Sequence, residues 1–283
     1  MGRSQADGAT IMMRIGVTGH RGRLGRELAK LGCVPIEADV ANFHALNAAI
    51  KLVKPEVIIH CAAFTDVDGC EGQPIKAALV NTGGVSNLAK AFSGKIVYIS
   101  TDYIFDGQFG PYLEFSAPNP LSIYGWSKLG GELALKHRSN DDDLIVRTTV
   151  LFGPDGDDFV GRVTDKLLAG EFVYLPDTLF GSPTYTPHLA EDILEAIDKG
   201  VCGTLNLAGS RVVSRYHFGQ RIARAADISV SLVKRGGIIG KAPRPPKAGL
   251  AINLALRLGF PARDPYDVLE TLVDCHRRKE QQQ

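Results

Sequence analysis

The stretch RIGVTGHRGRLGRELAKL, residues 14–31, decides the fold. It begins as a short apolar run typical of a strand and ends in a helical pattern, with Gly19, Gly22 and Gly25 between the two. Gly19 permits a tight turn, Gly22 lets the backbone approach a pyrophosphate, and Gly25 lets the helix and strand pack closely. Phosphates bind the free N–H groups at the N-terminus of a helix that follows such a turn. The stretch therefore predicts the first strand-turn-helix unit of a dinucleotide-binding domain.

Charged residues in and after this turn bear on the choice between NAD(H) and NADP(H). NAD-binding proteins usually place an acid about 20 residues further on, where it holds the ribose 2′-hydroxyl, and both Glu37 and Asp39 lie at a suitable distance. Arg21 and Arg23 stand inside the turn, and a guanidinium group pairs well with a 2′-phosphate. We therefore predict NADP(H) in preference to NAD(H), with Arg21, Arg23 and Leu24 beside the cofactor.

The alternation of strand and helix continues through the first half of the chain. The apolar runs RIGVT, EVIIHC, KIVYIS and LIVRTT are separated by segments whose apolar spacing is near 3.6. Strands this uniformly apolar are covered on both faces, which is typical of a doubly wound parallel α/β sheet (Rossmann) that binds its ligand at the carboxyl ends of the strands. We predict an NAD(P)-binding Rossmann domain over residues 13–153. Residues 154–283 are expected to form mostly a smaller α/β substrate domain, with 172–209 returning to the Rossmann sheet.

The composition limits the classes of partner. The 283 residues carry a formal net charge of +1 with mixed signs, so no basic surface suggests nucleic acid or an anionic membrane. No apolar run approaches the roughly 20 residues that span a bilayer, and no signal peptide is evident. The five cysteines are scattered without a C-x-x-C pair, so we predict no metal site. We expect a cytoplasmic protein with a small-molecule partner, and both a monomer and a homodimer remain open.

Two further segments carry residues suited to proton transfer. KIVYISTDYIFDG places Ser100, Thr101 and Asp102 at the carboxyl end of a strand, where the nicotinamide of a cofactor would lie. NPLSIYGWSKLGG places Tyr124 and Lys128 at i and i+4, on one face of a helix. A phenol has a pKa near 10, and a nearby ammonium lowers that pKa by favouring the phenolate. We predict that Tyr124 donates a proton to a carbonyl oxygen held by Thr101, while Lys128 also anchors the nicotinamide ribose.

Six segments resemble the extended short-chain dehydrogenase/reductases and, within them, the dTDP-4-dehydrorhamnose reductase family: TGHRGRLG, PEVIIHCAAFTDVDGCE, STDYIFDG, NPLSIYGWSKLGGE, GSPTYTPHLAEDI and PRPPKAGL. The resemblance runs from about Met13 to about Leu272. It implies NADPH-dependent reduction of the 4-keto group of a nucleotide-linked 4-keto-6-deoxy sugar, with Thr101, Tyr124 and Lys128 as the reactive residues.

The resemblance also implies roles for residues outside this trio. The cofactor residues that it adds are Asp39 and Val40 at the adenine, Ala62, Ala63 and Thr65 along the cofactor, and Asn81, which supports the site from its helix. The substrate residues that it implies are Asp102, Tyr103 and Phe105 at the sugar, and Gly181, Ser182, Pro183, Thr184 and Arg244 at the nucleotide end.

One position in the substrate-binding set departs from the family pattern. The family's RTSW motif, whose tryptophan packs on the sugar, reads RTTV here, so Val150 stands in place of the tryptophan.

Two alternatives stay open: a nucleotide-sugar epimerase of the same superfamily, and a non-catalytic NADP-binding regulatory subunit like the methionine adenosyltransferase β subunit. A dehydratase of this kind needs an acid and a base after the threonine to eliminate water. Position 103 is tyrosine, so the elimination base is missing.

Overall fold

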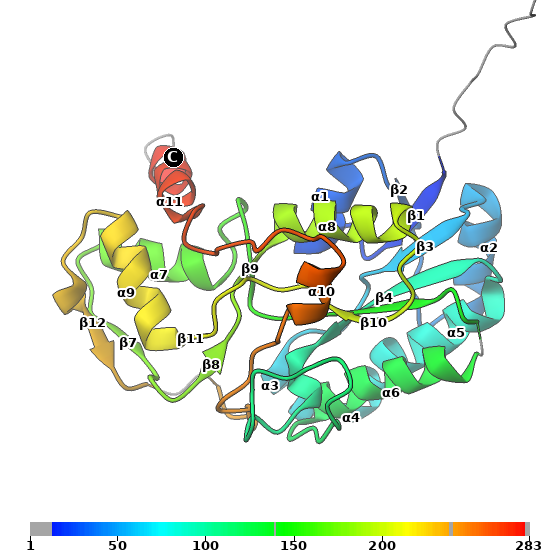
Figure 1. Ribbon diagram of the computed structural model, residues 1–283, viewed down its shortest axis with the longest axis horizontal. Coiled ribbons are helices and arrows are strands. Elements are labelled where there is room, and N and C mark those ends of the chain that lie inside the picture. Colours follow the sequence, from blue (N-terminus) through cyan, green and yellow to red (C-terminus); the bar gives the residue numbers. More distant parts are fainter. Residues whose placement is uncertain (1–12, 139, 238–239, 281–283) are drawn as a thin grey trace, which may run out of the picture.

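The computed structural model describes residues 13–138, 140–237 and 240–280. They form a large α/β part around one parallel sheet and a smaller lobe to its side (Figure 1). The N-terminal residues 1–12 lie outside the described residues.

The large sheet has six parallel strands in the order β10-β5-β4-β3-β1-β2. In chain order the strands are β1 (Ile15–Thr18), β2 (Val34–Pro35), β3 (Val57–His60), β4 (Lys95–Thr101), β5 (Leu144–Thr148) and β10 (Gly203–Asn206). A row of fully buried side chains, Val17, Ile59, Val97 and Leu144, crosses four of them in register. The strand order reverses next to β1, and ligands of open α/β sheets bind at such a switch point. The predicted doubly wound parallel sheet is confirmed.

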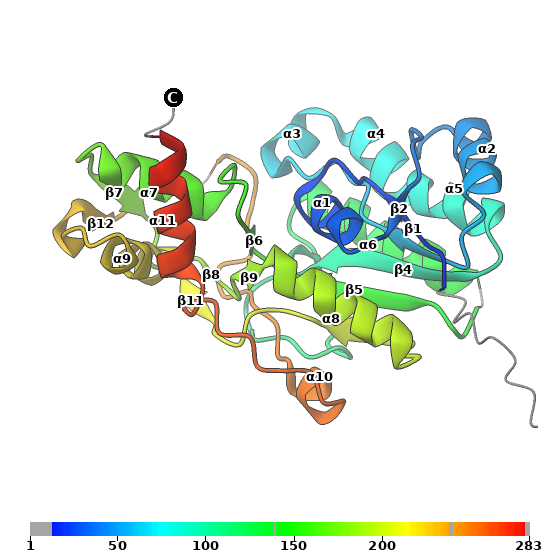
Figure 2. The same ribbon diagram turned by 90° about the horizontal axis from the view of Figure 1, so that it is seen from above.

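Helices cover both faces of this sheet (Figures 1 and 2). One face carries α1 (Arg23–Lys30), α8 (Thr186–Asp198) and α10 (Asn253–Arg257). The other face carries α2 (Phe43–Val53), the π-helical turn η1 (Ala78–Gly83), α5 (Gly84–Ala91) and α6 (Ile123–His137). The short helices α3 (Val67–Gly72), α4 (Pro74–Ala77) and η2 (Asp102–Ile104) follow strand ends or precede η1. Both faces are therefore apolar, as the uniformly apolar strands predict.

The smaller lobe has its own apolar core. Its helices and strands are α7 (Phe159–Leu168), β7 (Val173–Leu175), α9 (Arg215–Ala225), η3 (Val230–Leu232), β12 (Val233–Arg235) and α11 (Leu269–Glu280). Two short strand pairs connect the parts: β6 (Leu151–Phe152) with β9 (Thr184–Tyr185), and β8 (Phe180–Gly181) with β11 (Val213–Ser214).

The segment 172–209, predicted to return as a whole to the large sheet, divides between the two parts. Helix α8 packs on α1, and β10 extends the sheet beside β5. Strand β7 instead pairs with β12, because Val173 and Leu175 are buried in the core of the smaller lobe with Phe218.

Candidate active site

The glycine turn between β1 and α1 is tightly packed. Gly19 has a φ of +69°, and its carbonyl accepts a hydrogen bond of 2.9 Å from the Gly22 N–H. A Cβ on Gly19 would lie 2.5 Å from the Ala62 nitrogen, and one on Gly25 would overlap the Gly19 carbonyl oxygen. Glycine is therefore required at both positions, and the first N–H groups of α1 are left without helical partners, as a phosphate site needs.

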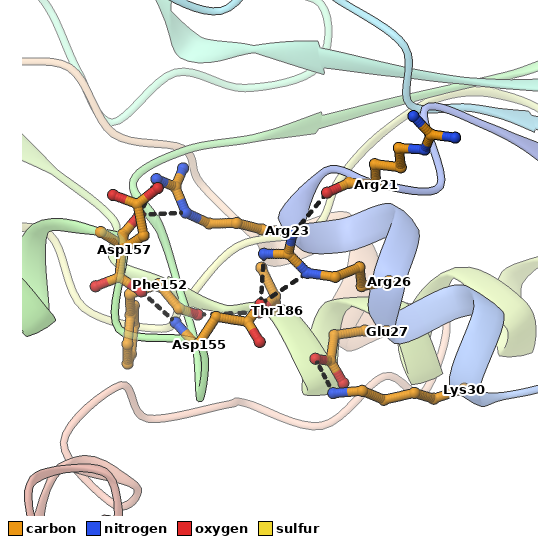
Figure 3. A network of polar contacts seen from close by, with 11 residues as sticks. Arg21, Arg23, Arg26, Glu27, Lys30, Phe152, Asp155, Asp157 and Thr186 are labelled. Atoms are coloured by element: carbon orange, nitrogen blue, oxygen red, sulfur yellow. Dashed lines mark hydrogen bonds and ion pairs between the residues drawn. The ribbon is translucent and has the colours of Figure 1, made fainter. Parts of the chain in front are cut away.

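The arginines of this turn have different surroundings (Figure 3). Arg23 Nε donates to the Asp157 carbonyl oxygen at 2.9 Å, and Arg26 pairs with Asp155 at 2.7 Å. These contacts tie α1 to the loop between β6 and α7. The Arg21 guanidinium points away from this network and has no hydrogen-bonding or ion-pairing partner among the residues that the structure describes. Of the two arginines predicted to read a 2′-phosphate, Arg21 is thus the one whose donors are available.

Both acids that stand near the expected ribose position already have partners. Glu37 lies 3.4 Å from His20, and Asp39 Oδ1 accepts a hydrogen bond of 3.0 Å from the Ala41 N–H. Of the two acids, Asp39 lines the cleft described below and Glu37 does not.

A cleft of about 720 Å³ runs from the glycine turn along the carboxyl edge of the sheet. It is lined by most of the predicted residues: Gly19, Arg21, Gly22, Arg23, Leu24, Gly25, Asp39, Val40, Ala62, Ala63, Thr65, Ser100, Thr101, Asp102, Tyr103, Tyr124, Lys128 and Val150. The segments far apart in the sequence that carry the predicted cofactor and catalytic residues therefore meet in one place.

The predicted catalytic trio lies together in the middle of this cleft. Tyr124 and Thr101 both line it, and the Thr101 hydroxyl lowers the pKa of the Tyr124 phenol. One turn along α6, Lys128 is 3% exposed, and its Nζ donates to the Ile99 carbonyl oxygen at 2.6 Å above the ring of Tyr98. Ser122 begins this helix by accepting a hydrogen bond from the Gly125 N–H, which fixes where the i and i+4 pair starts.

The ionisation of this pair differs from the prediction. Burial raises the pKa of Tyr124 well above its ordinary value, and the nearby Thr101 hydroxyl opposes this only in part. Burial lowers the pKa of Lys128 from 10.5 to about 7, although the Glu132 carboxylate acts in the other direction. The net pKa of Tyr124 is thus raised and not lowered, because desolvation dominates in the protein chain alone and the Lys128 amine is directed at the Ile99 carbonyl.

Buried polar networks hold the site from behind. Ser100 Oγ donates to Glu132 at 2.6 Å, and Glu132 is ion-paired with Arg147 at 2.8 Å. Burial raises the pKa of Asp102 to about 6, and its carboxylate accepts a hydrogen bond of 2.6 Å from Thr149. These contacts limit the motion of the end of β4, which carries Thr101.

Asn81 supports the site without lining the cleft. It lies in η1, accepts from the Phe64 N–H at 2.7 Å and donates to Ser127 Oγ at 2.8 Å. It thereby joins α6 to the segment after β3 that contains Ala62 and Thr65. A π-helical turn re-aims side chains in this way and often occurs at functional sites.

Several predicted substrate residues do not line the cleft. Phe105 is fully buried and stacks on Tyr112 with ring centroids 4.1 Å apart. Arg244 pairs with Asp68 at 2.8 Å. Residues Gly181, Ser182, Pro183 and Thr184 are buried, and the Ser182 and Thr184 hydroxyls accept backbone hydrogen bonds from Leu250 and Gly209.

Val150 lines the cleft in an unusual conformation. Its φ is +49°, which is sterically unfavourable for a β-branched residue. A Cβ on Gly181 would lie 2.8 Å from Val150 Cγ2, so the absence of a side chain at Gly181 makes room for it. Backbone strain of this kind clusters at functional sites.

Sequence reasoning missed other residues of the cleft. The cleft is also lined by Thr148, Thr149, Leu151, Asp157 and Arg215. Arg215 is the least expected, because it belongs to α9 in the smaller lobe and no motif pointed to it. Within the described residues, no three His, Cys, Asp or Glu side chains gather in a way that could hold a metal, and no helix there is both long and apolar enough to span a bilayer.

The combination of a phosphate-binding turn, a cleft along the carboxyl edge of a parallel sheet, and a threonine, tyrosine and lysine beside one another defines an NAD(P)-dependent oxidoreductase of the short-chain dehydrogenase/reductase class. Residues 13–275 match the family described as RmlD substrate binding domain. The chain belongs to this family, that of the dTDP-4-dehydrorhamnose reductases, as its motifs predict.

Individual relatives of the chain include enzymes and a subunit. The chain is similar to the dTDP-4-dehydrorhamnose reductase of Mycolicibacterium smegmatis, with 33% identity covering 92% of this chain and 85% of the relative. It is similar to the methionine adenosyltransferase 2 subunit beta of Xenopus tropicalis, with 31% identity covering 89% and 84%. The structure of dTDP-4-dehydrorhamnose reductase from Bacillus anthracis in complex with NADP superposes with a TM-score of 0.85 at 30% identity, covering 94% of this chain and 99% of that one.

Proposed function

We propose that the protein uses NADPH to reduce the 4-keto group of a nucleotide-linked 4-keto-6-deoxy sugar. The observation that carries this proposal is that Thr101 at the carboxyl end of β4 lines the cleft that starts at the phosphate turn, together with Tyr124 and Lys128, which lie one turn apart on α6. The names of the reductase relatives support the substrate class. In this proposal residues 13–153 supply mostly the cofactor half of the site and residues 154–283 mostly the substrate half.

The side chains of the trio divide the acid–base work. The bound cofactor supplies a hydride to the keto carbon. Tyr124 donates its proton to the keto oxygen, and the Thr101 hydroxyl holds that oxygen by a hydrogen bond. Because the pKa of Tyr124 is raised, its hydroxyl is protonated at neutral pH and is ready to act as the donor. Lys128 in its charged form stabilises the phenolate that donation leaves behind.

The preference for NADPH rests on Arg21. Its guanidinium has no partner among the described residues and lines the cleft beside the turn, whereas Glu37 and Asp39 have contacts of their own. A 2′-phosphate would satisfy its donors through charge-assisted hydrogen bonds. The relative in complex with NADP supports the same choice.

Oxidation of NADPH in the presence of a dTDP-linked 4-keto-6-deoxy sugar tests the proposal. We expect wild type to turn over, and Tyr124→Phe to lose roughly 100-fold or more in kcat while still binding NADPH, because the proton donor is gone. Tyr174→Phe is the matched control, since Tyr174 is 60% exposed on β7. Equal rates in wild type and Tyr124→Phe would refute the mechanism. Tightly retained oxidised NAD without any NADPH consumption would indicate an epimerase instead.

A regulatory subunit is the second candidate function. The similarity to the Xenopus subunit beta favours it, because that relative covers most of this chain. Such a subunit would bind NADP in the same cleft and consume none of it. NADPH binding by calorimetry, combined with no oxidation across a panel of 4-keto nucleotide-sugars, would support this candidate over the reductase.

A further inference from the structure

Arg215 is a cation in the cleft that no described residue pairs. It is the first residue of α9, and the cleft that it lines also contains Asp102, Thr149 and Val150 of the large part. Its Nε is inaccessible to solvent and has no hydrogen-bond partner within the described part of the chain. Its guanidinium packs over the ring of Phe159 at 5.1 Å and makes no hydrogen bond or ion pair with any residue that the structure describes.

The charged groups around Arg215 do not hydrogen-bond it. Asp102 and Tyr103 interact with it electrostatically, but the Asp102 carboxylate accepts its hydrogen bond from Thr149 instead. Arg244, which also faces it, is a further positive charge. Two other arginines of this region have carboxylate partners: Arg244 pairs with Asp68, and Arg147 pairs with Glu132. Arg215 differs from both.

An unpaired guanidinium with a desolvated nitrogen is unfavourable unless something supplies acceptors. A phosphate or a carboxylate does this best, because two of its oxygens match the fork of the guanidinium. The cofactor phosphates have their own site at the start of α1, on the large part. Arg215 comes from the smaller lobe, on the substrate side of Thr101, and is therefore placed to meet the second ligand.

We propose that Arg215 is a specificity-determining residue that binds an oxyanion of the sugar-nucleotide substrate. This inference rests on the proposed function, because it takes the second ligand to be a nucleotide-sugar. The oxyanion has two possible sources, the diphosphate that every such substrate carries and a carboxylate on the sugar ring. Both have the chemistry that an unpaired guanidinium recognises.

Calorimetric binding in the presence of NADP⁺ tests the inference without requiring turnover. The probes are dTDP-glucose and dTDP-glucuronate, which share the diphosphate and differ in the sugar carboxylate. The proteins are wild type, Arg215→Met, Arg215→Gln and the control Arg224→Met, an exposed arginine of the same helix. Unchanged NADP⁺ affinity shows that a variant has kept its fold, and Arg215→Gln serves where Arg215→Met does not fold.

We expect loss of the guanidinium to raise the Kd for a nucleotide-sugar by ~10-fold or more. Equal weakening of both probes assigns Arg215 to the diphosphate, and weakening of dTDP-glucuronate alone assigns it to the carboxylate. Unchanged affinity for both probes, or no binding of either probe by wild type, overturns the inference. If the Arg215 variants bind both probes as wild type does, and wild type reduces its keto substrate, the inference fails while the proposed function stands. Weakened binding in a protein that never oxidises NADPH supports the inference and defeats the reductase.

Discussion

Replacement of Lys128 by methionine should make the protein more stable and inactive at the same time. Lys128 is 3% exposed, and burial lowers its pKa from 10.5 to about 7. Each tenfold change in a proton equilibrium is worth about 1.4 kcal/mol, so a charged Lys128 destabilises the fold by an amount on the order of 5 kcal/mol. Methionine cannot make the hydrogen bond to the Ile99 carbonyl, and this loss reduces the expected gain in unfolding free energy by about 1 kcal/mol. We expect Lys128→Met to gain about 3–4 kcal/mol in unfolding free energy at pH 6.

The pH dependence separates this cause from a simple packing effect. Between the folded pKa near 7 and the unfolded value of 10.5, the unfolded chain binds more protons than the native protein. The stability of wild type therefore rises with pH through this window as the native lysine becomes neutral, and the unfavourable contribution vanishes above the unfolded pKa. Lys128→Met has no such group. The difference between the two proteins should thus shrink by about 2–3 kcal/mol from pH 6 to pH 9.

Urea unfolding of the two proteins at pH 6, 7.5 and 9, without cofactor, measures this difference. Lys136→Met is the matched control, because Lys136 lies exposed on the same helix. The unfolding free energy of Lys136→Met should stay within about 0.5 kcal/mol of the wild-type value at every pH. A Lys128→Met protein that is less stable than wild type at pH 6, or a difference that does not change with pH, would refute the reasoning. The variant should also fail to oxidise NADPH with substrate.

Three further substitutions test the turn and the cleft. Gly25→Ala forces a Cβ against the Gly19 carbonyl oxygen and should abolish NADPH binding in a fluorescence titration, whereas Gly72→Ala, where the added Cβ meets nothing, should not. Val150→Asn suits a φ of +49° and should raise the unfolding free energy by ~1 kcal/mol, whereas Val150→Thr keeps the branched Cβ and should not. Arg21→Ala should raise the KM for NADPH ~10-fold or more and leave that for NADH unchanged; equal effects on both cofactors would contradict the 2′-phosphate assignment.

The part of the fold that follows from local pattern was predictable. The four apolar runs became β1, β3, β4 and β5, because a buried parallel strand needs apolar residues on both faces and the sequence shows them. β7 lies in the segment that was predicted to return to the large sheet, but it pairs with β12 of the smaller lobe. Val173 and Leu175 suit any apolar core, so only the packing of Phe218 and its neighbours decides that β7 joins the smaller lobe.

The catalytic geometry and the ionisation of the same residues were predictable to different extents. Helical spacing puts Tyr124 and Lys128 on one face, and the structure places both in the cleft with Thr101. Their pKa values depend instead on burial and on what the ammonium contacts, and both are tertiary properties. The sequence showed that the Lys128 amine lies near the Tyr124 phenol, but it did not show that the Ile99 carbonyl accepts a hydrogen bond from that amine.

The place of Arg215 in the cleft could not be predicted from the sequence, and the structure gives the reason. In the sequence it follows Ser214, which accepts a hydrogen bond from the His217 N–H and begins α9, so it looks like an ordinary first residue of a surface helix. It reaches the cleft only because β11, which ends at Ser214, pairs with β8 and directs the start of α9 toward the large part. The proposed cofactor half of the site is built within short segments of one sheet and can be recognised from their spacing. The substrate half needs two parts of the chain to be docked against each other, so residues that select the substrate are expected where sequence motifs say least.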